Sequence, residues 1–320
     1  MRTARRSPAR LAISGVSLAT ALTVLGAAAA PAFADGTPAD KAASAAAVVE
    51  KATGTGDLAP SVNTTEAAAK AMVNTRAGEV TVTAPRGAAG DVKATAADGS
   101  SLGLKLAGTK GVSGVKAGSG TVVYGEVSKS TDLAVQPTTD GGARTLVTLK
   151  DRSASNEQRF DLDLPQGARL IPDGNGGFGV VKPAADGASM TVGAIEAPWA
   201  KDANGKPVAT DYKLDGNQLV QHIETNKDTA FPVVADPKIT WGNVTGTAYF
   251  TKSETKNIAI YGATAALSVG VLPPPLNVLY RINAALVTAK AAEARSDDYC
   301  LKIKFAAGVF VPGVYSNGCS

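Results

Sequence analysis

Short stretches of alternating apolar and polar residues constrain the fold of this 320-residue chain most strongly. In the clearest of them, 159–164, Phe160 and Leu162 alternate with Asp161 and Asp163. Such alternation places one set of side chains on the inner face of a β-strand and the other set toward solvent. Similar stretches recur at 80–83, 102–106, 121–127, 132–136, 145–150, 178–181, 190–195, 218–223 and 231–235.

Asp-Gly pairs lie between several of these stretches. Glycine tolerates a positive φ and aspartate caps its own turn, so each pair is a hairpin signal. The pairs are Asp98-Gly99, Asp140-Gly141, Asp173-Gly174, Asp186-Gly187 and Asp215-Gly216. Many short strands with frequent turns are typical of a β-sandwich. The sequence therefore predicts a mainly β protein with a β-sandwich domain at 78–236.

The first 34 residues have the pattern of a cleavable export signal. Four arginines and no acidic residue lie in the first ten positions, and an apolar, small-residue run follows from 11 to 30. The run ends in Ala32-Phe33-Ala34, which predicts cleavage between Ala34 and Asp35. A membrane anchor is the alternative, and the Ala/Gly-rich run and its cleavage site disfavour it. We expect a secreted, extracellular protein.

Removing this signal changes the charge of the chain. The whole sequence has 32 Lys and Arg against 28 Asp and Glu. Four of the arginines belong to the signal, so the remaining chain is close to neutral. A neutral chain has no overall attraction to nucleic acid, and no nucleic-acid partner is expected.

Residues 35–77 are rich in alanine and have few large apolar side chains. Two helical stretches are predicted, at 38–52 and 64–73, with breaks at 53–56 and at Pro60. Glu66 and Lys70 lie four positions apart and would support the second helix. We expect a helical or partly disordered N-terminal arm that is poorly anchored.

Residues 237–320 differ in pattern and predict a small α+β domain. Thr251 and Glu254 form a capping-box pattern before an apolar run, which predicts a helix to about residue 270. Pro273-Pro274-Pro275 ends it, and a second helix is predicted at 276–295. The apolar run at 258–272 is too short to span a membrane, so a helical hairpin is expected. A strand is predicted at 299–305, whose alternation places on one face Leu301, Ile303 and Phe305 and on the other Cys300, Lys302 and Lys304.

The two cysteines, Cys300 and Cys319, lie in this C-terminal part. In an exported protein such a pair predicts a disulfide. Closing the loop between the two cysteines should stabilise the fold by about 3 kcal/mol. A pair of metal-binding thiolates is the alternative, and the lack of a neighbouring histidine disfavours it.

The same C-terminal part is cationic, with a net charge of +4 from residue 237 onward. Together with its apolar helices, this charge fits contact with a cell-wall polymer, an anionic membrane surface or another extracellular protein. The alternative is a solvated basic face without a partner.

Neither a catalytic nor a cofactor-binding motif emerges from the sequence. The single histidine, His222, lies in a strand pattern and is interpreted as structural. Asp161 and Asp163 could act as paired carboxylates, but on an outward strand face they are interpreted as solvating charges. The loops at 173–177 and 202–205 resemble calcium loops only in part and are interpreted as turns. We expect no enzyme activity, cofactor or metal.

A resemblance to known proteins rests on two short motifs, Ala197-Pro198-Trp199-Ala200-Lys201 and Phe231-Pro232-Val233-Val234-Ala235-Asp236-Pro237. With Tyr124 and the strand at 160–162, the segment 124–237 resembles a β-rich module of uncharacterised secreted actinobacterial proteins. It also resembles the region that precedes the repeats of wall-associated and Rhs (YD-repeat) exported proteins. The resemblance implies a structural module without enzyme activity. As a large aromatic residue among small ones, Trp199 is expected to fill the core of the sandwich. No repeats follow in this chain.

Two functional hypotheses follow. The first is a non-enzymatic extracellular or cell-surface protein whose β-sandwich presents the C-terminal domain to a partner. The second is a secreted effector in which 238–320 is an antimicrobial or toxin-like payload. A hydrolase that uses Asp161 and Asp163 is a weaker third hypothesis.

Overall fold

The computed structural model describes residues 36–75, 78–173, 175–183, 189–241, 246–266, 280, 283–306 and 309–320. The predicted signal peptide, with Ala34 and Asp35, lies outside the described residues, and so does Pro273-Pro274-Pro275. Within the described part, no helix combines the length and apolar character needed to cross a bilayer.

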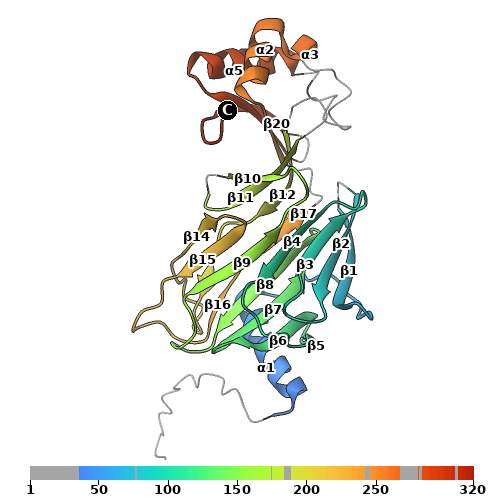
Figure 1. Cartoon of the computed structure of the whole chain (residues 1–320), viewed down its shortest axis with the longest axis vertical. Helices are drawn as coiled ribbons and strands as arrows, with labels where there is room; N and C mark the ends of the chain where they lie inside the picture. The colour runs from blue at the N-terminus through green and yellow to red at the C-terminus, as the bar shows by residue number, and fades with distance from the viewer. Residues whose placement is uncertain are drawn as a thin grey trace, which may run out of the picture.

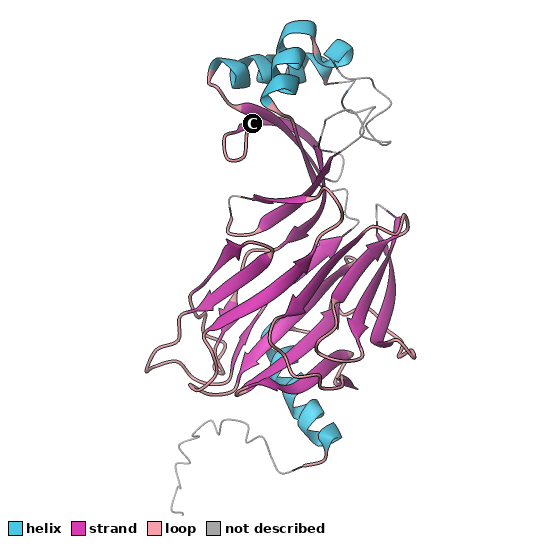
Figure 2. Ribbon diagram, in the orientation of Figure 1, coloured by secondary structure: helices cyan, strands magenta, loops and turns pink. Residues whose placement is uncertain are grey.

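The protein is mainly β, as predicted, and its antiparallel strands form two sheets that pack face to face (Figures 1 and 2). From one edge to the other, the strands of the first sheet are β1 (Ala67–Thr75), β2 (Gly78–Pro85), β3 (Val92–Ala96), β4 (Ser101–Leu106), β9 (Glu157–Asp163), β15 (Gln218–Ile223) and β14 (Thr210–Asp215).

The second sheet is larger and extends beyond the sandwich. Its main path consists of β20 (Val309–Tyr315), β19 (Cys300–Ala306), β18 (Gly246–Tyr249), β12 (Ser189–Ile195), β17 (Lys238–Trp241), β8 (Gly142–Leu149), β7 (Thr131–Pro137), β6 (Thr121–Ser128) and β5 (Val115–Ala117). The strands beside this path are β10 (Arg169–Pro172), β11 (Phe178–Pro183), β13 (Ala200–Lys201) and β16 (Val233–Ala235).

One apolar core lies between the two sheets and follows the predicted alternation. Phe160 and Leu162 of β9 point into it, while Asp163 is exposed. The largest side chain buried in it is Trp241, only 1% exposed, whose indole N–H donates to Ser100 O at 2.9 Å. The prediction that Trp199 fills the core is therefore wrong. Trp199 is partly buried on the outer face of the larger sheet, because it lies in a loop before β13.

The prediction of two helices in the N-terminal segment is only half right. Helix α1 (Pro38–Thr53) forms as expected, and Thr37 caps it through Asp40. The second predicted helix is instead strand β1, which pairs with β2. Its alanines favour a helix locally, but alternate positions are buried against the core and its backbone is satisfied by β2. Tertiary pairing therefore overrides local propensity.

Helix α1 packs on the outer face of the larger sheet. Ala46 and Val49 contact outward-facing side chains of that sheet, among them Val123 and Leu146. Small side chains let the helix approach the sheet closely. Figure 1 shows α1 at the end of the molecule opposite the C-terminal helices.

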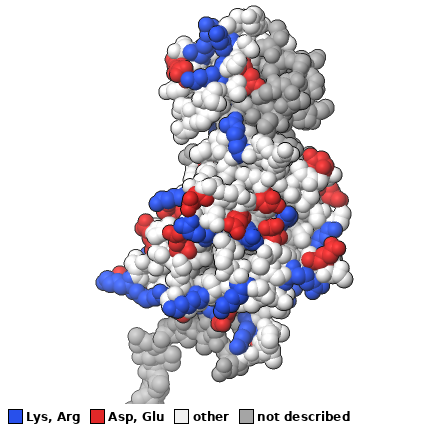
Figure 3. Space-filling model, viewed as in Figure 1, with Lys and Arg blue, Asp and Glu red and all other residues white. Residues whose placement is uncertain are grey.

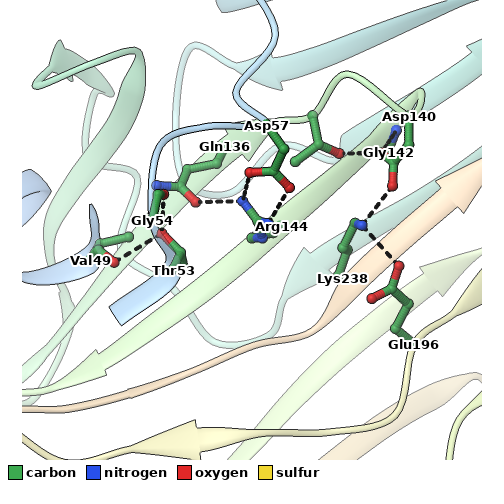
Figure 4. Close-up of polar contacts among 11 residues, drawn as sticks. Val49, Thr53, Gly54, Asp57, Gln136, Asp140, Gly142, Arg144, Glu196 and Lys238 are labelled. Atoms are coloured by element: carbon green, nitrogen blue, oxygen red, sulfur yellow. Dashed lines mark hydrogen bonds and ion pairs between the residues drawn. The ribbon is translucent and has the colours of Figure 1, made fainter. Parts of the chain in front are cut away.

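Polar contacts secure the chain that follows α1 (Figure 4). The Arg144 guanidinium, with a side chain only 12% exposed, forms a two-pronged ion pair with Asp57. Gln136 also accepts from Arg144, and nearby Lys238 pairs with Asp140 and Glu196 at 2.6 and 2.9 Å. The arm is thus anchored, contrary to expectation.

The C-terminal part is a helical layer on strands β18 to β20, as Figure 1 shows. The predicted capping box begins α2 (Lys252–Tyr261), where Glu254 accepts from Thr251 N at 2.7 Å. Gly262, with φ of 84°, interrupts the predicted long helix, and the short α3 (Ala263–Ala266) follows. Helix α5 (Ala284–Ser296) packs against α2 and ends close to the predicted residue.

This C-terminal layer continues the larger sheet. Strand β18 pairs with β12 on one side and with β19 on the other. Strand β17, which follows the expected boundary at residue 236, lies inside the sandwich between β12 and β8. One run of strands therefore links the sandwich to the C-terminal helices.

Candidate functional site

The predicted disulfide is present. Cys300 and Cys319 are bonded with their Cα atoms 5.6 Å apart. Cys300 begins β19, so the bond ties this strand to the turn that ends the chain. The backbone N–H of Lys252 also donates to Ser320 O at 3.1 Å, which joins the chain end to the start of α2.

Asp161 and Asp163 project outward from β9, and each carboxylate pairs with a lysine. The Lys105 ammonium lies 3.3 Å from Asp161, and the Lys93 ammonium lies 2.7 Å from Asp163. The amide of Gln218 donates to Asp161, and this bond together with Lys105 lowers the Asp161 pKa. Figure 3 shows acidic and basic side chains intermingled on the facing side of the molecule. This arrangement fits the predicted solvating role.

His222 lies on β15, on the face opposite the buried Leu219 and Ile223. Its neighbours in register are Asp211 on β14 and Glu157 on β9. The ring is thus one member of a row of polar residues across the outer surface of the first sheet.

The two loops that resemble calcium sites are closed by their own backbone. The Asp173 carboxylate accepts from the N–H groups of Asn175 and Gly177 at 2.7 and 3.0 Å. The Asp202 carboxylate accepts in the same way from Asn204 and Lys206, both at 2.9 Å. Both aspartates therefore cap turns, as the turn interpretation predicted.

A buried polar cluster that the sequence did not indicate lies where β16 meets β17. Asp236 is fully buried and accepts from Trp199 N at 2.9 Å and from the Gln221 amide at 3.4 Å. Burial raises the Asp236 pKa to about 7, although the Trp199 N–H and the Tyr212 hydroxyl act in the opposite direction. Burial and the nearby Asp236 raise the Tyr212 pKa well above its usual value.

The strongest candidate for a binding surface lies where the C-terminal strands meet β10. We call it the cationic tyrosine face, and it consists of Arg169, Tyr249, Lys302, Lys304 and Tyr315. The rings of Tyr249 and Tyr315 meet edge to face with their centroids 5.0 Å apart. They pack with Ile171 of β10 and Val181 of β11, so the face turns toward the sandwich.

The strand register places both lysines on this face. Tyr249 is the cross-strand partner of Lys302, and paired residues share a face of the sheet. Lys304 follows two positions later on the same side. The side chain of Lys302 lies over Gly313, where an added Cβ would be 3.6 Å from Lys302 Cε. The hydroxyl of Tyr315 donates to Phe250 O at 2.8 Å, which holds the ring in place.

Neighbouring positive charges shift the pKa values of residues on this face. Partial burial and the neighbouring Lys304 lower the Lys302 pKa. Arg169, an exposed residue, lies close enough to the Tyr315 hydroxyl to lower its pKa, although burial raises it overall. Among the described residues, neither lysine of this face forms an ion pair.

Two acidic groups are near the face, and both are already bonded. Asp173, which raises the Tyr249 pKa, accepts from its own turn. Glu254, which raises the Tyr315 pKa, accepts from Thr251 in the capping box. The arrangement is therefore suited to bind an anionic group, because the three cationic side chains of the face outnumber the two nearby carboxylates, which accept hydrogen bonds from their own turn and helix cap.

No protein family model, curated protein or solved structure matches the chain. The site is therefore interpreted from its own geometry.

Sequence reasoning reached only part of this site. The alternation at 300–305 predicted that Leu301 and Ile303 face one way and Lys302 and Lys304 the other, and the burial of Leu301 and Ile303 confirms it. Arg169 was missed because it lies more than a hundred positions from the lysines. No local pattern carries that long-range pairing.

Proposed function

We propose that this protein is secreted, works outside the cell without catalysing a reaction, and binds an anionic cell-wall polymer through its C-terminal part. The cationic tyrosine face carries this proposal. Lys302 and Lys304 act on each other on one face of β19, and Arg169 lies beside the hydroxyl of Tyr315, whose ring packs with Tyr249. Charge-assisted contacts to phosphate or carboxylate groups are among the stronger polar interactions available at a surface.

The position of the face favours a linear polymer over a membrane. Tyr315 packs against Ile171 of the sandwich, so the lysines lie on strands whose face turns toward β10. The sandwich would obstruct a flat bilayer, whereas an extended chain needs only to reach the exposed Arg169 and Lys304. The resemblance of 124–237 to modules of wall-associated proteins supports the same partner.

The ion pairs of the two candidate catalytic carboxylates support the proposal that the protein catalyses no reaction. Asp161 and Asp163 are engaged in ion pairs on an open strand face. Paired glycosidase carboxylates instead flank a substrate-binding cleft.

Co-sedimentation of the mature protein with purified cell walls tests the proposal. We expect salt-sensitive binding that becomes at least tenfold weaker when Lys302→Ala and Lys304→Ala are combined. The matched control combines Lys213→Ala and Lys227→Ala, which removes two exposed lysines from the sandwich. Walls stripped of anionic polymer should bind no better than the double variant binds intact walls. Equal binding by both double variants, or binding only to anionic lipid vesicles, would argue against the proposal.

The effector hypothesis has less support. A payload of 238–320 would include β17, which is paired with β8 and β12 inside the sandwich. Its release would leave the sandwich with a missing internal strand.

Intact mass of the protein from culture medium separates the two hypotheses. A single species from Asp35 to Ser320, two protons light because of the disulfide, is expected for a binding protein. A fragment that begins near Lys238 would instead favour the effector.

A further inference from the structure

A groove of about 590 Å³ lies at the end of the molecule opposite the C-terminal helices. It runs between the start of α1 and the strands β5 and β6. Its size falls within the range of roughly 300 to 1,000 Å³ that small-molecule sites occupy. It shares no residue with the cationic tyrosine face.

The groove has an apolar side and a charged rim. The small apolar side chains come from α1, from β5 and β6, and from the loop before β5: Ala42, Ala45, Val112, Val115 and Val123. The charged residues are Lys41, Lys110, Glu126, Asp132 and Lys150. A ligand that fits both parts must have an apolar chain and a charged head.

The sign of the head follows from the ion pairs. Lys150 is shared by Glu126 at 2.9 Å and Asp132 at 3.2 Å, so these three charges are mutually engaged. Lys41 and Lys110 form no ion pair with a described residue. The bond and charge of Lys150 lower the Glu126 pKa most, and Lys110 and Lys41 lower it further. The three lysines of the groove outnumber its two carboxylates by one, so the rim has a net charge of +1 and favours an anionic head.

The backbone of β6 holds this rim in an unusual conformation. Glu126 has a φ of 55°, in the left-handed region that side chains other than glycine seldom adopt. Its N–H donates to the Asp132 carboxylate at 2.7 Å, and the β6–β7 register shifts between Tyr124 and Ser128. Strained residues of this kind are often found at ligand sites. Here the bulge leaves Glu126 exposed beside the two lysines.

We propose that this groove binds a single-chain amphiphile with an anionic head, its alkyl chain against the apolar side and its head between Lys41 and Lys110. Carboxylate and phosphate heads both satisfy this chemistry. The inference is independent of the proposed function, because the two sites share no residue.

Titration of the mature protein with dodecanoate, dodecyl phosphate and 1-dodecanol, each below its aggregation concentration, tests the inference by calorimetry. We expect saturable binding of one or both anions and at least tenfold weaker binding of the neutral alcohol. Combining Lys41→Ala and Lys110→Ala should weaken anion binding at least tenfold and leave alcohol binding unchanged. The preferred anion identifies the natural head group.

Two further variants test whether binding occurs in the groove itself. Ser113→Trp places a large ring in the groove from an exposed position and should abolish binding without lowering the melting temperature. Lys129→Ala removes an exposed lysine outside the groove and should bind as the parent does. Absence of binding by the parent protein would overturn the inference. Equal affinity for dodecanoate and dodecanol, or full binding by the double lysine variant, would do the same.

Discussion

Trp199 and Asp236 are joined by a reciprocal pair of hydrogen bonds. The Trp199 N–H donates to the Asp236 carboxyl group at 2.9 Å, and the Asp236 N–H donates to Trp199 O at 3.3 Å. The pair continues the ladder between β13 and β16, in which Ala200 faces Ala235. It therefore connects the segments 197–201 and 231–237, and it buries one carboxyl group.

Replacing Asp236 with asparagine should stabilise the protein above neutral pH. Burial raises the pKa of this carboxyl group from 3.8 to about 7, so folding favours the protonated form. The contribution of this raised pKa to the free energy of unfolding is fully present below pH 3.8, declines as the pH rises toward 7, and is lost above pH 7. Over that window the loss is on the order of 4 kcal/mol. Urea unfolding at pH 5 and pH 8 measures the part that is lost above pH 5, about 3 kcal/mol, and Asp236→Asn should remove this part of the pH dependence.

The exposed Asp228 provides the control for this prediction. Asp228→Asn should keep the pH dependence of the parent protein. In Asp236→Asn the new amide can donate to Gln221 Oε1, a buried oxygen that has no hydrogen-bond partner among the described residues. An unchanged difference between pH 5 and pH 8 in Asp236→Asn would mean that another group controls it.

A charge on the buried side of α1 should detach the helix. Ala46 is fully buried against the sheet, whereas the adjacent Ala47 is exposed. Ala46→Glu buries a carboxylate without a partner and should cost about 3 kcal/mol or more. Limited proteolysis should then cut within 36–66 at least tenfold faster, while Ala47→Glu is cut at the parent rate. Equal rates for the two variants would show that α1 is not held by this contact.

A methyl group at position 193 should disturb the core. A Cβ there would lie 2.5 Å from Trp241 Cε3 and 2.6 Å from Thr240 O, so the tryptophan or the strand must move. We expect Gly193→Ala to lower the free energy of unfolding by about 1–3 kcal/mol and to alter the fluorescence of the buried tryptophan. Gly111→Ala is the matched control, because its Cβ would meet nothing within 4 Å.

Removing the disulfide should destabilise the C-terminal part selectively. The Cys300→Ala and Cys319→Ala double variant loses a cross-link worth about 3 kcal/mol in the chain-entropy model. Hydrogen exchange should quicken in α2, α5 and β19 while the strands of the first sheet keep their protection. Uniform loss of protection over both sheets would instead show that the two parts unfold together.

The sequence alone specified a strand, a helix start and the disulfide, because adjacent residues or one short pattern determine each of them. The alternation of Phe160 and Leu162 with two aspartates specifies a half-buried strand, and the capping box at Thr251 starts a helix. The two cysteines predicted the cross-link. In each case the residues that decide the outcome are adjacent in the chain or belong to one pattern, so side-chain period and capping chemistry suffice.

Tertiary structure alone decided the rest. The alanine-rich stretch 67–73 has the local preference of a helix and became β1 because β2 satisfies its backbone and the core buries its alternate side chains. The shifted pKa of Asp236 and the proximity of Arg169 to Tyr315 depend on strand packing over long sequence separations. Burial and charge proximity are set by which strands pack together, and no local sequence pattern encodes them.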